Sequence, residues 1–254
     1  MIKTNFLIAL CLLICVSAFS QGNANANVIK DAQTLEKQFK EPEALELYKT
    51  VLKNDASNIE CLVKCTELSC SIGARQADQK AKAAYYQDAL SYAQKAITVN
   101  AGSSAANYAM ALAAGKMTEI EDENKKIVAY VKQIKEYGDK ALALDPNNAK
   151  ANYIAGKWHY EMNNLHWAKK VAVKTLYGGL PKASLDSAIY YMDKCCKLDV
   201  YFTPSYLDLA KAYIDDDQPG KAIEVLNKLV KLPNRVYDDA AIKAEGKKML
   251  EKLQ

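Results

Sequence analysis

The chain has 254 residues, a length that allows either one large core or an extended array of small units. Half of the residues are hydrophobic and a quarter are charged, which is ordinary for a folded globular protein. The formal net charge of +4 is small for a chain of this length and does not favour nucleic acid, whose binding proteins usually carry a clustered basic surface, so we expect no nucleic-acid partner. Glycine (10) and proline (6) are few, and this composition favours helices.

The first twenty residues, 1–20, are predicted to be a secretory signal peptide. Lys3 supplies a positive charge and an apolar run of eleven residues follows from Phe6. Small residues, Ala18 and Ser20, occupy the −3 and −1 positions of a cut before Gln21. The apolar run is shorter than the roughly 20 residues that span a membrane. An uncleaved N-terminal anchor is the alternative interpretation.

Cleavage at this point would define the organisation of the remaining chain. We expect an exported protein, periplasmic or secreted, with a flexible mature N-terminus at 21–27 and a single domain at 28–254. No second long apolar run follows, so we expect no transmembrane segment after cleavage.

Five of the seven cysteines would remain in the mature chain: Cys61, Cys65, Cys70, Cys195 and Cys196. An odd number without a C-x-x-C pair fits neither a disulfide framework nor a zinc-site spacing. These cysteines are either small apolar residues on buried helix faces or the source of one disulfide between the two clusters.

Helical periodicity covers nearly the whole chain after residue 27, and no strand pattern of useful length appears. The pattern predicts about twelve antiparallel helices: 28–39, 42–54, 57–72, 77–98, 102–117, 122–144, 147–162, 165–177, 183–198, 204–215, 219–231 and 236–252. The lysine-rich outer side of the last helix suits a terminal cap.

Internal self-similarity predicts that these helices form repeated pairs. "ANYAMALA" begins at 106 and "ANYIAGKW" begins at 151, which is 45 residues later. Between Ala188 and Ala222 the offset shortens to 34 residues. The longer offset predicts either longer helices or an insertion near residues 72–85.

The 34-residue period resembles the tetratricopeptide repeat (TPR). Within 203–233, Tyr206 and Tyr213 flank Leu209 and the small Ala210, and Ala222 is the small residue of the second helix. Small residues at these positions let two antiparallel helices cross closely. The resemblance implies an all-α, TPR-like right-handed helical solenoid.

The stretch "WHYEMNNLHW" at 158–167 holds both tryptophans and both histidines of the chain. Gly156 and Ala168 are predicted to be the small residues where helices 147–162 and 165–177 cross. Because Ala188 follows only 20 residues after Ala168, the repeat phase breaks here. Trp158 and Trp167 are predicted to fill the space that this break leaves.

The same stretch also raises the question of a metal site or of acid–base catalysis. On one helix His159 and His166 would lie about 10 Å apart, too far to share a metal ion. A folded turn could bring both histidines near Glu161, but no nucleophile motif or phosphate loop accompanies them. We therefore predict no enzyme, no catalytic residue, no cofactor and no metal, and keep catalysis as the third alternative.

A second resemblance runs through this stretch. Its matching elements are Gly156, Trp158, Tyr160, Leu165, Trp167, Lys170, Leu176, Gly178, Pro181 and Ala188, followed by the Tyr206–Tyr213 repeat with Lys211. Over roughly 147–250 the chain is similar to the regulator of microtubule dynamics family of eukaryotic TPR-like proteins. The resemblance implies a scaffold without a catalytic role. Some members of the family bind microtubules and others bind phospholipid. With a cleaved signal peptide, the resemblance implies an exported bacterial relative that does not meet microtubules.

The TPR resemblance also implies a concave groove lined by the first helix of each pair. The predicted groove residues are Tyr153, Lys157, Tyr160, Glu161, Leu207, Lys211, Ile214 and Asp215. Lysines interleaved with tyrosines suit an acidic peptide or a lipid headgroup, and the alternative is an ordinary solvated face. We predict a non-enzymatic exported scaffold that binds a protein or peptide in this groove. The alternative is a carrier of a lipid or another apolar ligand inside the superhelix.

Overall fold

The computed structural model describes residues 24–165, 173–176, 178 and 182–254, and all regular secondary structure in these ranges is helical. A first helix covers residues 24–37. It is followed by α2 (Glu41–Asn54), α3 (Ile59–Ala74), α4 (Gln79–Val99), α5 (Ser104–Met117), α6 (Asn124–Leu144), α7 (Ala149–Asn163), α9 (Leu185–Leu198), α10 (Thr203–Asp215), α11 (Pro219–Leu229) and α12 (Asp239–Leu253). The all-α prediction is confirmed.

Two predictions about the N-terminal region have different outcomes. Residues 24–27, which we expected to be flexible, belong to the first helix. The physical reason is packing, because Asn25 is largely buried and its side chain accepts a hydrogen bond from Asn54 of α2 at 3.4 Å. The predicted signal peptide at 1–20 lies outside the described residues. No described helix is long and apolar enough to cross a membrane.

Several helices begin at a residue whose side-chain oxygen accepts a backbone N–H three residues later. These residues are Asn58, Asp78, Ser103, Asn148 and Ser184, at the starts of α3, α4, α5, α7 and α9. Such caps satisfy one of the free N–H groups at a helix start. They explain why the polar clusters in the sequence mark the helix boundaries.

The 45-residue self-similarity has a structural cause in two buried asparagines. Asn107 donates hydrogen bonds from its side-chain amide to the carbonyls of Ala101 (3.0 Å) and Ser103 (2.8 Å). Asn152 makes the equivalent bonds to Pro146 (3.0 Å) and Asn148 (2.8 Å). Each asparagine therefore holds the turn that precedes its own helix.

The longer offset comes from longer helices. Both α4 and α6 have 21 residues, whereas α11 of the C-terminal repeat has 11. Only residues 75–78 separate α3 from α4, so the segment 72–85 contains no long loop, and its second half belongs to the start of α4.

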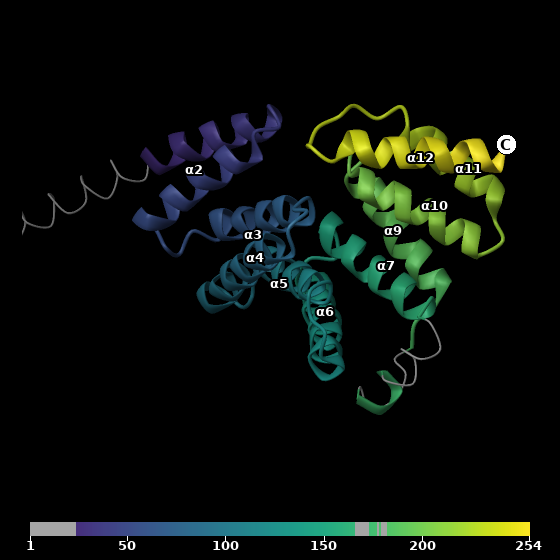
Figure 1. Ribbon diagram of the computed structural model, residues 1–254, viewed down its shortest axis with the longest axis horizontal. Helices are drawn as coiled ribbons and strands as arrows, with labels where there is room; N and C mark the ends of the chain where they lie inside the picture. Colours follow the sequence, from purple (N-terminus) through teal and green to yellow (C-terminus); the bar gives the residue numbers. More distant parts are fainter. Residues whose placement is uncertain (1–23, 166–172, 177, 179–181) are drawn as a thin grey trace, which may run out of the picture.

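The helices pack as successive antiparallel pairs, α3 with α4, α5 with α6, α7 with α9, and α10 with α11 (Figure 1). The first helix of each pair (α3, α5, α7 or α10) also contacts the first helix of the next pair. The second helices make no comparable contacts with each other within the described ranges. In a curved array the helices that touch lie on the inner side, so the first helices line the concave face.

The partner of α7 is α9, and this corrects the predicted pairing of 147–162 with 165–177. A Cβ atom on Gly156 would lie 2.7 Å from Met192 Cγ and 3.1 Å from the carbonyl oxygen of Ala188, both in α9. Ala168 lies outside the described residues, and Ala188 occupies the position that we assigned to it. The phase break is therefore an insertion, 164–184, between the two helices of one pair.

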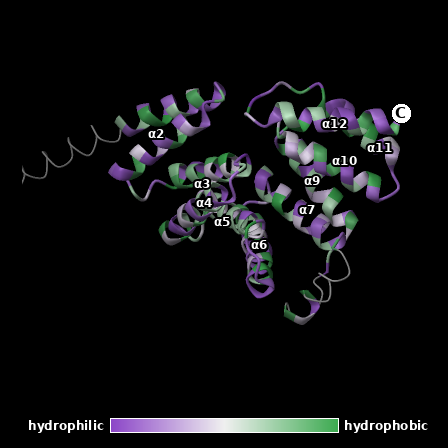
Figure 2. Cartoon of the chain, viewed as in Figure 1, coloured by the Kyte–Doolittle hydropathy of each residue, from purple (hydrophilic) through white to green (hydrophobic). Residues whose placement is uncertain are grey.

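Hydrophobic and hydrophilic residues alternate along each helix (Figure 2), and the hydrophobic ones gather in clusters between neighbouring helices. In the C-terminal repeat Ala210 and Ala222 are fully buried and belong to one cluster with Leu226 and Leu229. All five described cysteines are buried and none forms a disulfide. Burial raises the pKa of Cys195 and of Cys196 to about 12, as expected for thiols that serve as small apolar residues.

Candidate functional site on the concave face

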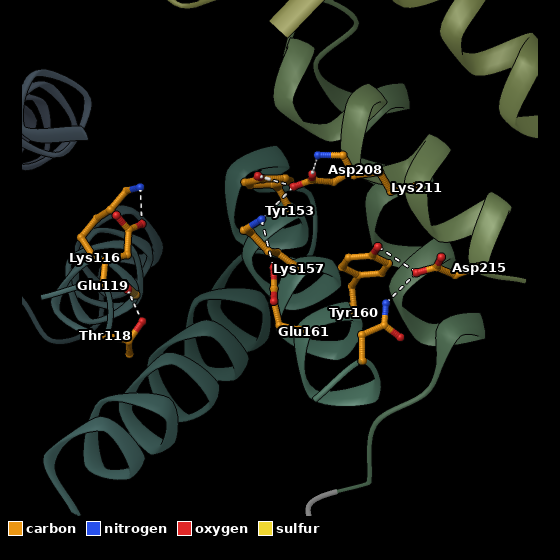
Figure 3. A network of polar contacts seen from close by, with 12 residues as sticks. Lys116, Thr118, Glu119, Tyr153, Lys157, Tyr160, Glu161, Asp208, Lys211 and Asp215 are labelled. Atoms are coloured by element: carbon orange, nitrogen blue, oxygen red, sulfur yellow. Dashed lines mark hydrogen bonds and ion pairs between the residues drawn. The ribbon is translucent and has the colours of Figure 1, made fainter. Parts of the chain in front are cut away.

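Helices α7 and α10 are joined on the concave face by a network of polar side chains centred on Asp208 (Figure 3). Its carboxylate accepts a hydrogen bond from the Tyr153 hydroxyl at 2.8 Å and pairs with Lys157 Nζ at 3.0 Å. Lys211 Nζ lies 3.6 Å from the other carboxylate oxygen. Asp208 is 7 % exposed, so this is a buried charge with several partners.

The network continues to both sides of Asp208. Lys211 pairs with Glu245 of α12 at 2.9 Å, and Lys157 lies 3.5 Å from Glu161 one turn further along α7. At the end of α7, the Tyr160 hydroxyl donates a hydrogen bond to Asp215 of α10 at 2.8 Å (Figure 3). We call this group the α7 network; its members are Tyr153, Lys157, Tyr160, Glu161, Asp208, Lys211, Asp215 and Glu245.

The electrostatic environment stabilises the charged form of the α7 lysine. Burial lowers the pKa of Lys157, but the attraction of Asp208 and then of Glu161 outweighs it, so the net shift is upward. Burial and the nearby Asp208 carboxylate raise the pKa of Tyr153 well above its usual value. Both groups therefore keep their protons at neutral pH, and neither is tuned for proton transfer.

Six of the eight predicted groove residues belong to the α7 network. The other two do not reach it. Leu207 is 5 % exposed and packs in the C-terminal core, and Ile214 packs against the same core. The reason is the rotation of α10, which turns Asp208 toward α7 and Leu207 into the layer behind it.

Beside the α7 network lies a pocket of about 460 Å³ between α5, α6 and α7. Its apolar lining consists of Ala111, Leu112, Gly115, Ile127, Val128, Val131, Ile134, Ile154, Trp158, Met162, Leu165 and Val173. Its polar lining consists of Lys116, Thr118, Glu119, Asn124, Tyr153, Lys157 and Glu161. The volume falls within the range of about 300–1,000 Å³ that is usual for ligand sites. We call it the α5–α7 pocket.

The two lysines of this pocket are already paired with acids. Lys116 lies 2.7 Å from Glu119, whose other oxygen accepts a hydrogen bond from Tyr86 at 2.8 Å. Lys157 is held by Asp208 and Glu161, as described above. The polar lining therefore offers both donors and acceptors without an unpaired positive charge (Figure 3).

The Trp/His cluster divides between the core and residues that are not described. Trp158 is 4 % exposed, packs with Val128, Met162 and Val173, and forms part of the pocket wall. The ring of His159 lies 5.2 Å from that of Trp158 and stacks on Tyr191 at 5.9 Å. Burial and then the charge of Lys135 lower the pKa of His159. His166 and Trp167 lie outside the described residues.

No group of three or more metal-binding side chains occurs among the residues that the structure describes. The structure also adds residues that the sequence reasoning missed, above all Asp208, Lys116 and Glu119. One signal for Asp208 was available, because this acid has apolar neighbours, Leu207 and Leu209, on a predicted core helix and must find a partner if the helix is buried on several sides. Lys116 and Glu119 carried no comparable signal, because only the packing of α5, α6 and α7 creates the pocket that they line.

Comparisons with known proteins agree with this architecture. The model of the family described as "Regulator of microtubule dynamics protein 1-3" matches residues 28–254. The chain belongs to this family. The match covers the N-terminal repeats as well, beyond the region of roughly 147–250 on which the sequence resemblance rested.

Individual relatives are 25–30 % identical to the chain within the segments that align. Regulator of microtubule dynamics protein 1 of Mus musculus is 25 % identical over 94 % of this chain and 79 % of its own length. The Caenorhabditis elegans protein 1 is 30 % identical over 47 % of this chain, and the match spans 53 % of its length. For protein 2 of Homo sapiens the match is 29 % identical over 57 % of this chain and spans 35 % of the human protein.

Among solved structures, a thermophilic TPR protein of Thermus thermophilus superposes with a TM-score of 0.63. The alignment covers 89 % of this chain and 99 % of that one at 14 % identity. At this identity the likeness establishes the fold, and the TPR-like solenoid is confirmed. Solenoids of this kind present extended concave surfaces that can bind a partner.

Proposed function

We propose that this protein is an exported, non-catalytic scaffold that binds a segment of a protein or peptide on its concave face. In this proposal an apolar side chain of the partner enters the α5–α7 pocket. The α5–α7 pocket is the observation that carries the proposal, since it combines an apolar interior with paired polar groups at its edge.

The charge state of the pocket favours a peptide over a strongly acidic ligand. An anionic group would have to displace Asp208 or Glu161 from Lys157, or Glu119 from Lys116. A peptide backbone carries neutral donors and acceptors, and it can bind to such ion pairs without breaking them. The acidic peptide that the lysines suggested is therefore replaced by a partner with an apolar anchor.

Filling the pocket provides a direct test. A Cβ atom on Gly115 would have Ile134 Cδ1 at 3.8 Å as its nearest neighbour, so a leucine there can extend into the pocket without moving the backbone. Peptides selected from a random library against the wild-type protein should bind Gly115→Leu about 10- to 100-fold more weakly, because one buried apolar side chain is lost. Isothermal titration calorimetry measures this difference.

Gly220→Leu is the matched control, since Gly220 lies on the exposed side of α11 and has nothing within 4 Å of its Cβ position. Equal affinity of the selected peptides for Gly115→Leu and for Gly220→Leu would exclude the pocket as the anchor site. Lys157→Glu is a poorer test, because it places a third carboxylate beside Asp208 and Glu161 and threatens the fold itself.

A carrier of a lipid or another apolar ligand is the second candidate. The apolar lining contributed by α5, α6 and α7 favours it. Native mass spectrometry of protein purified from its own host without detergent distinguishes the two. A lipid that copurifies with the wild type but not with Gly115→Leu would support the carrier. Protein without bound lipid would exclude the carrier and favour the peptide-binding scaffold.

Export has its own test. We expect the mature protein to begin at Gln21, and intact-mass measurement of protein from the host checks this. Finding Met1 would overturn the proposed cleavage and restore the uncleaved anchor.

A further inference from the structure

Arg75 connects two parts of the chain that are far apart in the sequence. It directly follows α3, and its guanidinium pairs with Glu41, the first residue of α2. It also pairs with Asp238, which precedes α12, at 2.7 Å. The Arg75–Asp238 contact spans 163 residues.

Aromatic contacts reinforce the same junction. The Arg75 guanidinium lies 4.4 Å from the ring centre of Tyr237, and the guanidinium of Arg235 lies 4.2 Å from that of Tyr201. Arg75 and Arg235 are the two arginines in a chain that carries 34 lysines and arginines. A planar guanidinium can bridge two carboxylates and stack on a ring at once, whereas a lysine ammonium cannot do both equally well.

The contact is unusual for a solenoid, in which each unit touches its sequence neighbours. Within the described ranges, no other hydrogen bond or ion pair joins residues 24–100 to residues 203–254. Figure 1 shows the loop between α11 and α12 extending from the C-terminal repeats toward the ends of α2 and α3. The solenoid is thus closed across its open side by one small contact.

We propose that Arg75, Glu41, Tyr237 and Asp238 form a clasp that holds the two ends of the solenoid together. The clasp is anchored unequally. The Glu41 side chain is 7 % exposed, whereas those of Arg75 and Asp238 are 25 % and 36 % exposed. The clasp therefore opens on the side of the α11–α12 loop, while Arg75 remains on Glu41.

Opening of the clasp widens the space enclosed by α3, α7, α10 and α12. The effect on access to the concave face rests on the proposed function, whereas the closure itself does not. Ions screen a partly exposed ion pair, so rising ionic strength weakens the Arg75–Asp238 contact. The clasp is in this respect a salt-sensitive control of the solenoid's shape.

The test uses the full mature chain without any ligand, so a failure of the proposed function does not affect it. The double substitution Tyr237→Ala and Asp238→Ala removes the loop side of the clasp and leaves the Arg75–Glu41 pair in place. Val236→Ala is the matched control, since Val236 is an exposed residue of the same loop. Small-angle X-ray scattering at about 50 mM and about 500 mM salt gives the radius of gyration, and hydrogen exchange reports on residues 232–240.

We expect the wild type and Val236→Ala to expand from low to high salt. The double variant should be expanded at both salt concentrations, with about 5- to 10-fold faster exchange at 232–240 in low salt. A double variant with the wild-type radius of gyration and wild-type exchange in low salt would overturn the clasp. A circular dichroism melt of each protein confirms that all three are folded at the temperature of the measurement.

Discussion

The α3–α4 and α7–α9 pairs cross in the same way, although their connections differ greatly. Residues 75–78 join α3 to α4, whereas residues 164–184 separate α7 from α9. In both pairs a glycine of the first helix faces the second helix. A Cβ atom on Gly73 would lie 2.8 Å from the ring of Tyr86, and one on Gly156 would lie 2.7 Å from Met192. The close crossing thus depends on the facing residues and not on the length of the connection.

The two pairs differ in what surrounds the crossing. In the first, Tyr86 of α4 is fully buried against Gly73, and its hydroxyl reaches Glu119. In the second, α7 borders both the α5–α7 pocket and the α7 network. The pair with the long connection is also the pair that carries the candidate site. Substitutions at each of these neighbours measure how far the packing of α7 depends on them.

Trp158→Ala should have the largest effect. This side chain is 4 % exposed and supports α7 against α6, so its truncation should lower the free energy of unfolding by about 3–5 kcal/mol. Chemical denaturation followed by circular dichroism measures the change. Tyr190→Ala on the exposed side of α9, where Tyr190 is 60 % exposed, should stay within about 0.5 kcal/mol. A Trp158→Ala protein as stable as the wild type would show that α7 does not rely on this contact.

Gly156→Ala and Gly73→Ala compare the two crossings directly. Each should lower the free energy of unfolding by about 1–3 kcal/mol, since the new methyl group overpacks a tight contact. Gly156→Ala should cost more, because its neighbours include the backbone nitrogen of Met192 at 3.0 Å and the carbonyl of Ala188. Gly220→Ala, with open space around its Cβ position, should be neutral or stabilising by up to about 1 kcal/mol. If Gly156→Ala stabilises as Gly220→Ala does, the close crossing of α7 and α9 is refuted.

Asp208→Asn tests the polar attachment of α7 to α10. The amide can still accept a hydrogen bond from Tyr153, but it loses the charge that pairs with Lys157, so we expect a loss of about 1–2 kcal/mol. Lys197→Ala breaks the exposed pair with Asp193 and should have a clearly smaller effect, because water and salt screen that pair. Thermal unfolding of both variants at one salt concentration makes the comparison. Equal losses would mean that burial adds nothing to the Asp208 contacts.

The smallest expected effect is the pH dependence contributed by His159. Burial, followed by the charge of Lys135, lowers its folded-state pKa below the value of about 6.5 in the unfolded chain. The unfolded state then binds more protons, so this contribution is complete above pH about 6.5 and is lost as the pH falls toward the folded pKa. In His159→Gln the unfolding free energy should decrease less between pH about 7 and pH about 5. Identical pH slopes for the variant and the wild type would contradict the burial of this ring.

The repeat architecture could be predicted because its signals are local. The capping residues Asn58, Ser103 and Asn148 begin helices within two residues of the predicted starts. The "ANY" repeat marked two equivalent turns, and Asn107 and Asn152 hold them by the same hydrogen bonds. Periodicity and caps act within a few residues of one another, so the chain carries this information along its length.

The candidate site was predictable only in part, because it depends on how helices are rotated and paired. The TPR pattern placed Lys157 and Lys211 on one face, but it left them as free cations and omitted the acid between them. Lys157 of α7 is neutralised by Asp208 of α10, and Lys211 of α10 by Glu245 of α12, so both contacts depend on how different helices pack together.

The sequence by itself determined that this chain forms helices, where most of them begin, and that they repeat as pairs. Only the tertiary structure decided that α9 pairs with α7, where Gly156 faces Met192 and Ala188 of α9. It also decided where the α5–α7 pocket opens and that Arg75 meets Asp238 across the solenoid. These features arise from the summed curvature of all the pairs, and each pair contributes to that curvature through contacts between residues distant in the sequence.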